Sequence, residues 1–298
     1  MTETKYAIVI VTYNRKELLC ECLECVQRQR VLASSIIIIN NASTDGTGVY
    51  LETFSEKNPI VDVINLPQNI GGAGGFAKGI ERAVEKNVEC VLLIDDDAMI
   101  ADDYMEKLLW ARKNTPQYHA FAGTVKVDGK IDVFHRRMIS RTGLLFRNCA
   151  EQDYQQPYFE CDIASFCGMV LDIVLVRQIG IPHAEYFIWH DDAEYSLRVR
   201  KHCKFLTVTE AVLDHKTIVK HNEHPRRYDW KDYYAIRNRI WLVREHGTFV
   251  DKLVNWSDLF IHVIFRNWLF GLMRRDHYDW QAEKNMVKKA IRDAKNKF

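Results

Sequence analysis

The stretch Val91-Leu92-Leu93-Ile94-Asp95-Asp96-Asp97 joins an apolar run to three consecutive carboxylates. Four apolar residues in a row indicate a buried strand, and the aspartates mark its end. Adjacent carboxylates repel one another unless a cation neutralises them. Asp95 and Asp97 can point the same way in an extended segment, which leaves Asp96 to point elsewhere or to touch a substrate. Their oxygens suit Mg²⁺ or Mn²⁺, and the alternative is a solvated acidic turn that caps the next helix.

Upstream of this stretch, short apolar runs alternate with helical patterns. Strands are predicted at Tyr6–Thr12, Ser35–Ile39 and Val61–Asn65, with a helix from Lys16 to about Gln29. This alternation is typical of βαβ units, so the sequence predicts an α/β fold with a Rossmann-like, mostly parallel central sheet flanked by helices. The polar residues that follow the strands then lie at the sheet edge where ligands bind in such folds.

Downstream, the pattern changes to short strands and turns and then to helices. Strands are predicted near Phe121–Val127 and Gly168–Leu171, and helices at Asp191–Arg200, at Trp230–Glu245, from Val254 and from Trp280. We therefore expect a catalytic domain over residues 1–225 and a C-terminal helical region over residues 226–298.

Bulk composition narrows the class of protein. The 298 residues carry a formal net charge of +1, which provides no field to attract nucleic acid. Eight cysteines lack a repeated CxxC spacing, and no signal peptide precedes the first strand. These features predict a cytoplasmic protein with free thiols. Cys20, Cys22 and Cys25 share a helical pattern with leucines, so we interpret them as packing residues.

A glycine-rich stretch, Asn69-Ile70-Gly71-Gly72-Ala73-Gly74-Gly75-Phe76, follows the third strand. Glycines let the backbone approach a ligand closely, and a helix after them would offer free N–H groups to an anion. The stretch fits a dinucleotide-binding fingerprint poorly because it follows the third strand and not the first. A tight turn that binds no ligand would have the same glycine-rich sequence.

A second acidic group, Asp191-Asp192, stands at the predicted start of a helix, directly after Trp189 and His190. Two carboxylates there can simply favour the helix dipole. Alternatively, one of them deprotonates a substrate hydroxyl while its neighbour raises its proton affinity. The acidic triplet about a hundred residues earlier favours the second interpretation.

His215 follows a predicted strand and precedes a basic loop. A nitrogen ligand beside two carboxylates suits Mn²⁺ better than Mg²⁺. His221 and His224 allow a zinc site in principle, but no cysteine accompanies them.

Aromatic and apolar residues dominate Val254–Met273, which polar side chains interrupt and two arginines follow. No stretch reaches the roughly 18 uncharged apolar residues that a membrane span needs. The segment is typical of an interfacial helix at a membrane surface, although a helix packed on its own domain would look similar.

In their order along the chain, these motifs resemble family 2 inverting glycosyltransferases, which have a GT-A fold. The resemblance covers roughly residues 6–245. The pieces that carry it are Val9-Ile10-Val11-Thr12-Tyr13-Asn14-Arg15, Asn41-Ala42-Ser43-Thr44-Asp45-Gly46-Thr47, Asp95-Asp96-Asp97 and Asp191-Asp192-Ala193-Glu194. The glycine-rich stretch, the acidic motifs and a later run of Tyr233-Tyr234 with Arg237-Asn238 look most like the galactofuranosyltransferase and rhamnosyltransferase branch.

The resemblance implies a role for each matching position. The nucleotide-sugar donor would be bound by Thr12, Tyr13, Asn14, Asp45, Asn69, Gly72 and Asp96. Mn²⁺ (or Mg²⁺) would be bound by Asp95, Asp97 and His215. Asp192 would be the catalytic base, supported by Asp191, and Trp189 and His190 would meet the acceptor.

The implied reaction transfers a sugar, with inversion, to a hydroxyl of a glycan or lipid-linked glycan during cell-surface polysaccharide synthesis. UDP-galactofuranose is the expected donor and dTDP-rhamnose the alternative. His190 departs from the galactofuranosyl pattern, where tryptophan precedes the acidic pair, so acceptor recognition can differ. We expect the enzyme at the inner face of the cell membrane, in peripheral contact through Val254–Met273. The rival interpretations are a dinucleotide-dependent oxidoreductase and a non-catalytic binding subunit.

Overall fold

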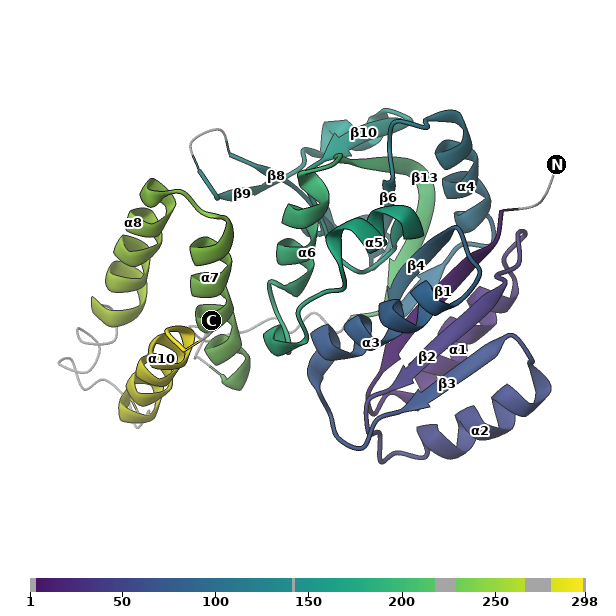
Figure 1. Ribbon diagram of the computed structural model, residues 1–298, viewed down its shortest axis with the longest axis horizontal. Helices are drawn as coiled ribbons and strands as arrows, with labels where there is room; N and C mark the ends of the chain where they lie inside the picture. The colour runs from purple at the N-terminus through teal and green to yellow at the C-terminus, as the bar shows by residue number, and fades with distance from the viewer. Residues whose placement is uncertain (1–3, 141–142, 218–228, 266–279, 297–298) are drawn as a thin grey trace.

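The computed structural model describes residues 4–140, 143–217, 229–265 and 280–296 (Figure 1). Its central sheet has the strand order β10-β13-β6-β12-β4-β1-β2-β3, with β5 beside β13 and β7 beside β6. Six strands of this path run in one direction, and β12 and β10 run against them. The predicted mostly parallel α/β sheet is confirmed.

The N-terminal half consists of βαβ units, as the alternating pattern predicted. Its strands are β1 (Tyr6–Thr12), β2 (Ser35–Asn40), β3 (Val61–Asn65) and β4 (Cys90–Asp95). Its helices are α1 (Lys16–Gln27), α2 (Thr47–Lys57) and α3 (Gly71–Glu85). All residues of β1 and β2 are buried, because helices cover both faces of this part of the sheet.

The second half of the sheet combines two long strands with several short ones. Its strands are β5 (Ala98–Ile100), β6 (Ala120–Val127), β7 (Lys130–Ile131), β10 (Tyr158–Cys161), β12 (Met169–Asp172) and β13 (Phe205–His215). The associated helices are α4 (Tyr104–Asn114), α5 (Ile173–Ile179) and α6 (Asp191–Arg200). Short 3-10 turns lie at η1 (Val133–His135), η2 (Glu151–Gln155) and η3 (Ala184–Tyr186). A separate small sheet joins β11 (Ile163–Ala164), β8 (Arg136–Ile139) and β9 (Phe146–Asn148).

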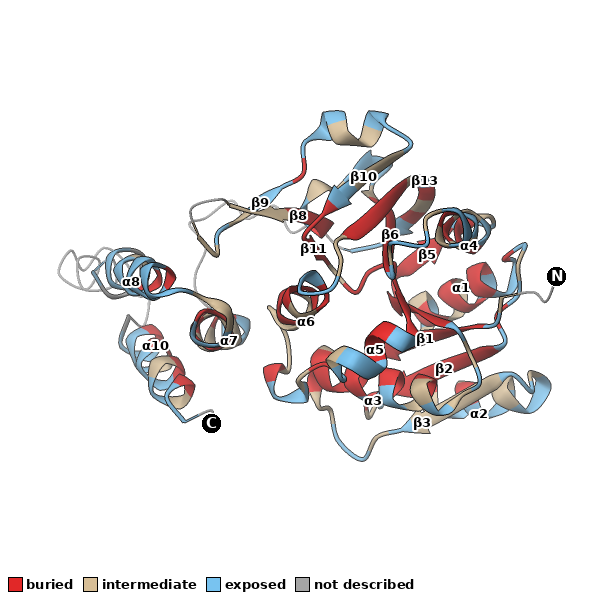
Figure 2. Ribbon diagram, turned by 45° about the horizontal axis from the view of Figure 1, so that its top comes forward, coloured by how far each residue is buried: buried red, intermediate tan, exposed pale blue. Residues whose placement is uncertain are grey.

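Alternation along the strands divides the core between the two faces of the sheet. Ile8 and Ile10 of β1 pack in one cluster with buried residues of α1, α2 and α4. Val9 and Val11 point to the opposite face and pack with α3, α5 and α6. Figure 2 shows the resulting buried layer through the strands and the inward sides of these helices. Successive side chains of a strand alternate between faces, so one apolar run supplies both clusters.

The C-terminal helices stand at one end of the molecule, beside α6 (Figure 1). They are α7 (Trp230–His246), α8 (Phe249–Asp258), the π-helical turn η4 (Leu259–Phe265) and α10 (Trp280–Ala294). The prediction that a helix starts at Val254 was wrong. α8 begins at Phe249 because Thr248 and Asp251 cap each other's backbone N–H groups. Within the described parts of the chain, none of the helices combines the length and apolar character that a bilayer crossing requires.

All eight cysteines lie in described parts of the chain and are free thiols. Cys22 and Cys25 pack in the core cluster around α1. The prediction of free thiols is confirmed, as is the packing role of Cys22 and Cys25, whereas Cys20 is half-buried and lies outside that cluster.

Candidate functional site

The predicted metal ligands meet at the carboxyl ends of two strands. Asp95 ends β4, and His215 ends β13. The Nε2 atom of His215 lies 3.1 Å from Oδ1 of Asp97. Ligand atoms of Asp95, His215 and Cys167 all lie within 4.8 Å of one another. The structure therefore brings the three predicted ligands together and adds a cysteine that the sequence analysis missed.

Arg15 was also missed, although it follows the strand-end residues of β1. Its Nη1 lies 2.6 Å from Oδ2 of Asp97 and 3.1 Å from Oδ1 of Asp96. Burial and the charge of Asp97 raise the pKa of Asp95 to about 7. Burial also acts to raise the pKa of Asp97, but His215 and Arg15 outweigh it and hold that pKa below its usual value. The carboxylates thus lie in a site where Arg15 and His215 supply positive charge.

The donor atoms available here fit Mn²⁺ or Mg²⁺. Two carboxylates and an imidazole offer oxygen and nitrogen ligands. Nδ1 of His215 is buried and has no hydrogen-bond partner among the described residues. Burial raises the pKa of the Cys167 thiol well above its ordinary value, so the thiol stays protonated and is a poor ligand. Asp95, Asp97 and His215 are therefore the better set.

Hydrogen bonds join the loops after β1 and β2, where donor-binding residues were predicted. Oδ1 of Asn14 accepts the backbone N–H of Thr44 at 2.7 Å. Oδ2 of Asp45 accepts the backbone N–H of Lys16 at 3.1 Å. Thr12 is buried, whereas 44% of the surface of Tyr13 is exposed. The four predicted residues thus share one loop cluster at the same sheet edge as the acidic triplet.

The glycine-rich stretch is different from the predicted loop, because α3 already begins at Gly71. A Cβ at Gly75 would meet Val11 at 2.5 Å, so this glycine lets the helix pack closely on β1. At Gly72 an added Cβ would meet nothing within 4 Å. Oδ1 of Asn69 accepts the N–H of Gly71 at 2.8 Å. Sequence alone did not separate packing glycines from the one that faces open space.

The acidic pair begins α6, as predicted. Burial and the charge of Asp192 raise the pKa of half-buried Asp191 to about 8, and the charge of Asp95 adds to the shift. The acidic pair therefore lies within electrostatic range of the metal-site residues. Oδ2 of Asp192 lies 3.3 Å from Nη2 of Arg137, a residue of β8 that the sequence analysis did not identify. This contact places the carboxylate of Asp192 beside a cationic side chain.

The loop before α6 is held in an unusual backbone conformation. Phe187, Trp189 and His190 have φ values of 63°, 68° and 66°, a region that costs free energy for residues other than glycine. Nδ2 of Asn238, a fully buried residue of α7, lies 2.8 Å from the carbonyl oxygens of Ile188 and Trp189. Asn238 thus fixes the segment that presents the two predicted acceptor residues.

A cavity of about 460 Å³ opens beside His190, between α7, α8 and residues 144–146. Its wall is mostly apolar, and Arg239, Asp258 and Asn255 add polar groups. Oδ1 of Asn255 is buried without a hydrogen-bond partner in the described part of the chain. The cavity therefore offers a bound molecule apolar contact together with a hydrogen-bond acceptor.

Asp191 makes stability depend on pH. Its pKa of about 8 in the folded state is far above the roughly 3.9 of an unfolded chain. The folded state therefore binds the additional proton between these values, and the free energy of unfolding falls as pH rises from about 4 to 8. We expect Asp191→Asn to stabilise the protein by about 2 kcal/mol at pH 8, allowing for solvent screening. Urea unfolding in EDTA at pH 5 and pH 8 measures this.

At pH 5 the advantage of Asp191→Asn should fall to roughly a third of its value at pH 8, because only about one of the four pH units over which the wild type loses stability lies below pH 5. Glu185→Gln, at an exposed site on η3, serves as the control. An equal effect of Asp191→Asn at both pH values would contradict the raised pKa.

Comparison with known proteins identifies the family of this chain. The model of the family "Glycosyl transferase family 2" matches residues 7–179. Galactofuranosyltransferase GlfT1 of Mycobacterium tuberculosis is 27% identical over 292 residues, covering 93% of this chain and 91% of GlfT1. The uncharacterized glycosyltransferase YwdF of Bacillus subtilis is 34% identical over 126 residues. That alignment covers 42% of this chain and 45% of YwdF, so the likeness spans less than half of that relative.

Solved structures share the fold at low sequence identity. GalNAc-T7 with UDP, GalNAc and Mn²⁺ superposes with a TM-score of 0.68 at 14% identity, over 96% of this chain and 55% of that one. TarS 1–349 of S. aureus, in complex with UDP-GlcNAc, gives a TM-score of 0.59 at 14% identity, over 98% and 80% of the two chains. The predicted GT-A fold is confirmed, and a dinucleotide-dependent oxidoreductase is not supported. The chain belongs to glycosyl transferase family 2 and is a glycosyltransferase.

Proposed function

We propose that the enzyme transfers a hexose, with inversion and with the help of Mn²⁺ or Mg²⁺, from a nucleotide sugar to a glycan hydroxyl. One observation carries the proposal: Asp95, Asp97 and His215 converge within electrostatic range of a second carboxylate pair. A metal-bound leaving group and a base are the two needs of a single displacement, and these two groups of residues can supply them.

One group of residues acts on the leaving group, and the other acts on the attacking hydroxyl. Asp95, Asp97 and His215 would hold the metal, which supplies Lewis-acid stabilisation of the departing nucleoside diphosphate. Asp192, which contacts Arg137, takes the proton of the acceptor hydroxyl as the hydroxyl oxygen attacks the anomeric carbon. Asp191, whose pKa is raised to about 8 by burial and by the charge of Asp192, would support the base as its neighbour. Attack from the face opposite the leaving group inverts that carbon.

The donor is proposed to be UDP-galactofuranose, with dTDP-rhamnose as the alternative. The similarity to GlfT1 over nine-tenths of both chains supports the first. Thr12, Tyr13, Asn14 and Asp45 would receive the nucleotide, with Asp45 accepting the N3–H of the base. Asn69, Gly72 and Asp96 would face the diphosphate and sugar. The open space at Gly72 supports this placement.

The acceptor is proposed to be a growing, lipid-linked surface glycan that meets Trp189 and His190 and reaches the site along the cavity beside His190. Exposed apolar side chains of α8 and η4 would rest on the inner face of the membrane. They include Phe249, Val250, Leu253, Val254, Trp256, Phe260, Ile261 and Phe265. The rest of the predicted membrane segment, residues 266–273, lies outside the described residues. We propose the same domain boundary as before, with a catalytic domain over residues 1–225 and a helical region over residues 226–298.

Calorimetric titration of UDP- and dTDP-sugars, with and without Mn²⁺, tests the proposal. We expect UDP-galactofuranose to bind at least about tenfold more tightly than dTDP-rhamnose and only when the metal is present. Asp45→Asn should weaken binding of the nucleotide, because the asparagine amide is not a purely accepting partner for the N3–H of the base. If no nucleotide sugar binds under any metal condition, the proposed chemistry of this site is wrong.

A further inference from the structure

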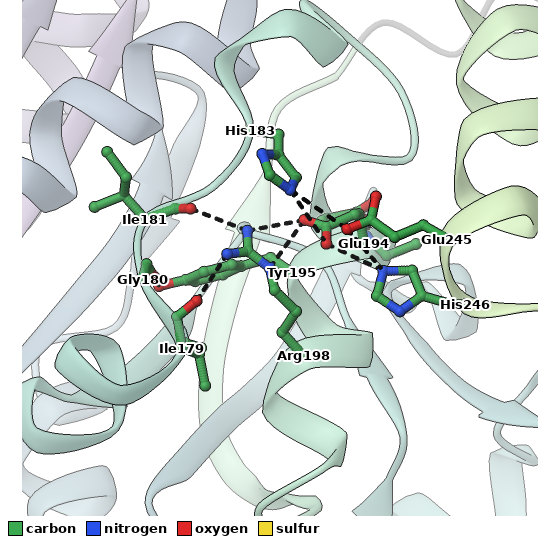
Figure 3. Close-up of polar contacts among 11 residues, drawn as sticks. Ile179, Gly180, Ile181, His183, Glu194, Tyr195, Arg198, Glu245 and His246 are labelled. Carbon is green, nitrogen blue, oxygen red and sulfur yellow. Dashed lines mark hydrogen bonds and ion pairs between the residues drawn. The ribbon is translucent and has the colours of Figure 1, made fainter. Parts of the chain in front are cut away.

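A second group of histidines and carboxylates lies where α6 meets the end of α7 (Figure 3). His183 directly precedes η3, and Glu194 belongs to α6. Glu245 and His246 are the last two residues of α7. Glu194 is fully buried, so its charge depends on partners within the protein. None of the four has a role in the transfer reaction proposed above.

Ligand atoms of His183, Glu194 and Glu245 all lie within 4.8 Å of one another, and His246, which is not part of that group, contacts both carboxylates. Nε2 of His183 lies 3.9 Å from Oε1 of Glu194 and 3.5 Å from Oε1 of Glu245. Nε2 of His246 lies 3.1 Å and 3.9 Å from the same two oxygens. Four ligands about 2.05 Å from a tetrahedral zinc ion are separated by about 3.4 Å. The four contacts bracket that spacing.

Arg198 leaves the relevant oxygen of Glu194 free to bind a cation. Its Nε and Nη2 both donate to Oε2 of Glu194, at 3.2 and 2.9 Å. Its Nη1 and Nη2 are anchored on the carbonyl oxygens of Ile179 and Ile181. Oε1 therefore faces the histidines while Oε2 is fixed by a partner. Such outer hydrogen bonds orient the carboxylate ligands of metal sites.

We propose that His183, Glu194, Glu245 and His246 bind a Zn²⁺ ion that joins α7 to α6. Imidazole nitrogens and carboxylate oxygens are zinc ligands, and four protein ligands are typical of a structural site without an open position. On binding the ion, the imidazole of His246 would move toward the other three ligands to reach tetrahedral spacing. The ion is distinct from the metal proposed at Asp95, Asp97 and His215.

Such an ion would act on the geometry of the transfer site. α6 begins with the acidic pair, and α7 carries Asn238, which holds the preceding loop. Fixing the end of α7 to α6 thus constrains both supports of that loop. This inference does not depend on which donor or acceptor the enzyme uses.

Metal analysis of the full chain after dialysis against excess Mg²⁺ and limiting Zn²⁺ tests the inference. We expect one zinc per chain in the wild type and in Asp97→Ala, which lacks a ligand of the other site. His183→Gln/His246→Gln should lose at least about nine-tenths of that zinc, because glutamine conserves hydrogen bonding but is a poor zinc ligand. Glu245→Gln, at a more exposed position, should weaken binding at least tenfold without endangering the fold.

Two further measurements separate a zinc site from a network of ion pairs. Cobalt in place of zinc should give the intense visible absorption of tetrahedral coordination in wild type and Asp97→Ala. Zinc at a hundred times its Kd should raise Tm by about 5 °C in both proteins and leave the double variant unchanged. Absence of retained zinc in the wild type, or equal retention by the double variant, would overturn the inference.

Discussion

Asp97→Ala is expected to abolish the metal dependence of donor binding and to lower turnover by about a thousandfold. Asp97 contacts His215 and Arg15 at once, so its loss removes a metal ligand and the group that organises the site. A divalent ion supplies several kcal/mol of stabilisation to a departing diphosphate, and about 4 kcal/mol corresponds to that rate factor.

Two measurements check this prediction. Calorimetry with the donor should show that Mn²⁺ no longer changes the affinity, and product formation should fall at saturating donor and acceptor. Asp102→Ala is the matched control, since Asp102 is an exposed aspartate that pairs only with surface Arg28 in the described contacts. Unchanged metal dependence in Asp97→Ala would mean that the triplet is an acidic turn and not a metal site.

Asp192→Asn is expected to lower kcat by about 10²–10⁴-fold, the usual contribution of a general base. The asparagine keeps the size of the side chain and its contact with Arg137 but cannot accept a proton. Donor affinity should stay within about twofold, because the metal ligands are untouched. Steady-state kinetics together with donor calorimetry separates the two effects.

Asp191→Asn is the informative companion of Asp192→Asn. Because the pKa of Asp191 is about 8, Asp191→Asn should remove the change of kcat that accompanies titration near pH 8, while activity remains measurable. Glu185→Gln again controls for the loss of a nearby acid. If Asp191→Asn is the variant that loses kcat and Asp192→Asn retains it, the base is Asp191 and the two roles are exchanged.

The sequence predicted local features well where one physical cause dominated. β1 and β3 have the predicted bounds, because a short apolar run between polar turns leaves little choice of where the strand begins and ends. The start of α6 at Asp191 followed from carboxylates at a helix N-terminus. The antiparallel direction of β12 was not predictable, because it depends on which strands lie beside it and not on its own residues.

The parts of the site that escaped prediction come from distant segments. Arg137 is 55 residues from Asp192, and nothing in the sequence around it distinguishes this buried arginine from an exposed one. Arg15 had a usable signal, since it stands at a strand end beside predicted donor-binding residues. The conformation of residues 187–190 depends on Asn238 of a later helix, so local propensity gave no hint of it.

Gly71 is where the donor side and the acceptor side of the enzyme touch. A Cβ on this residue, which has φ +76°, would lie 2.1 Å from the carbonyl oxygen of Phe187, and the N–H of Ala73 donates to that same oxygen at 3.1 Å. A shift of α3 on binding a diphosphate would therefore be passed to the loop that precedes the proposed catalytic carboxylates. Because this contact couples the two binding sites, we expect an ordered sequence in which the donor binds first and the acceptor second.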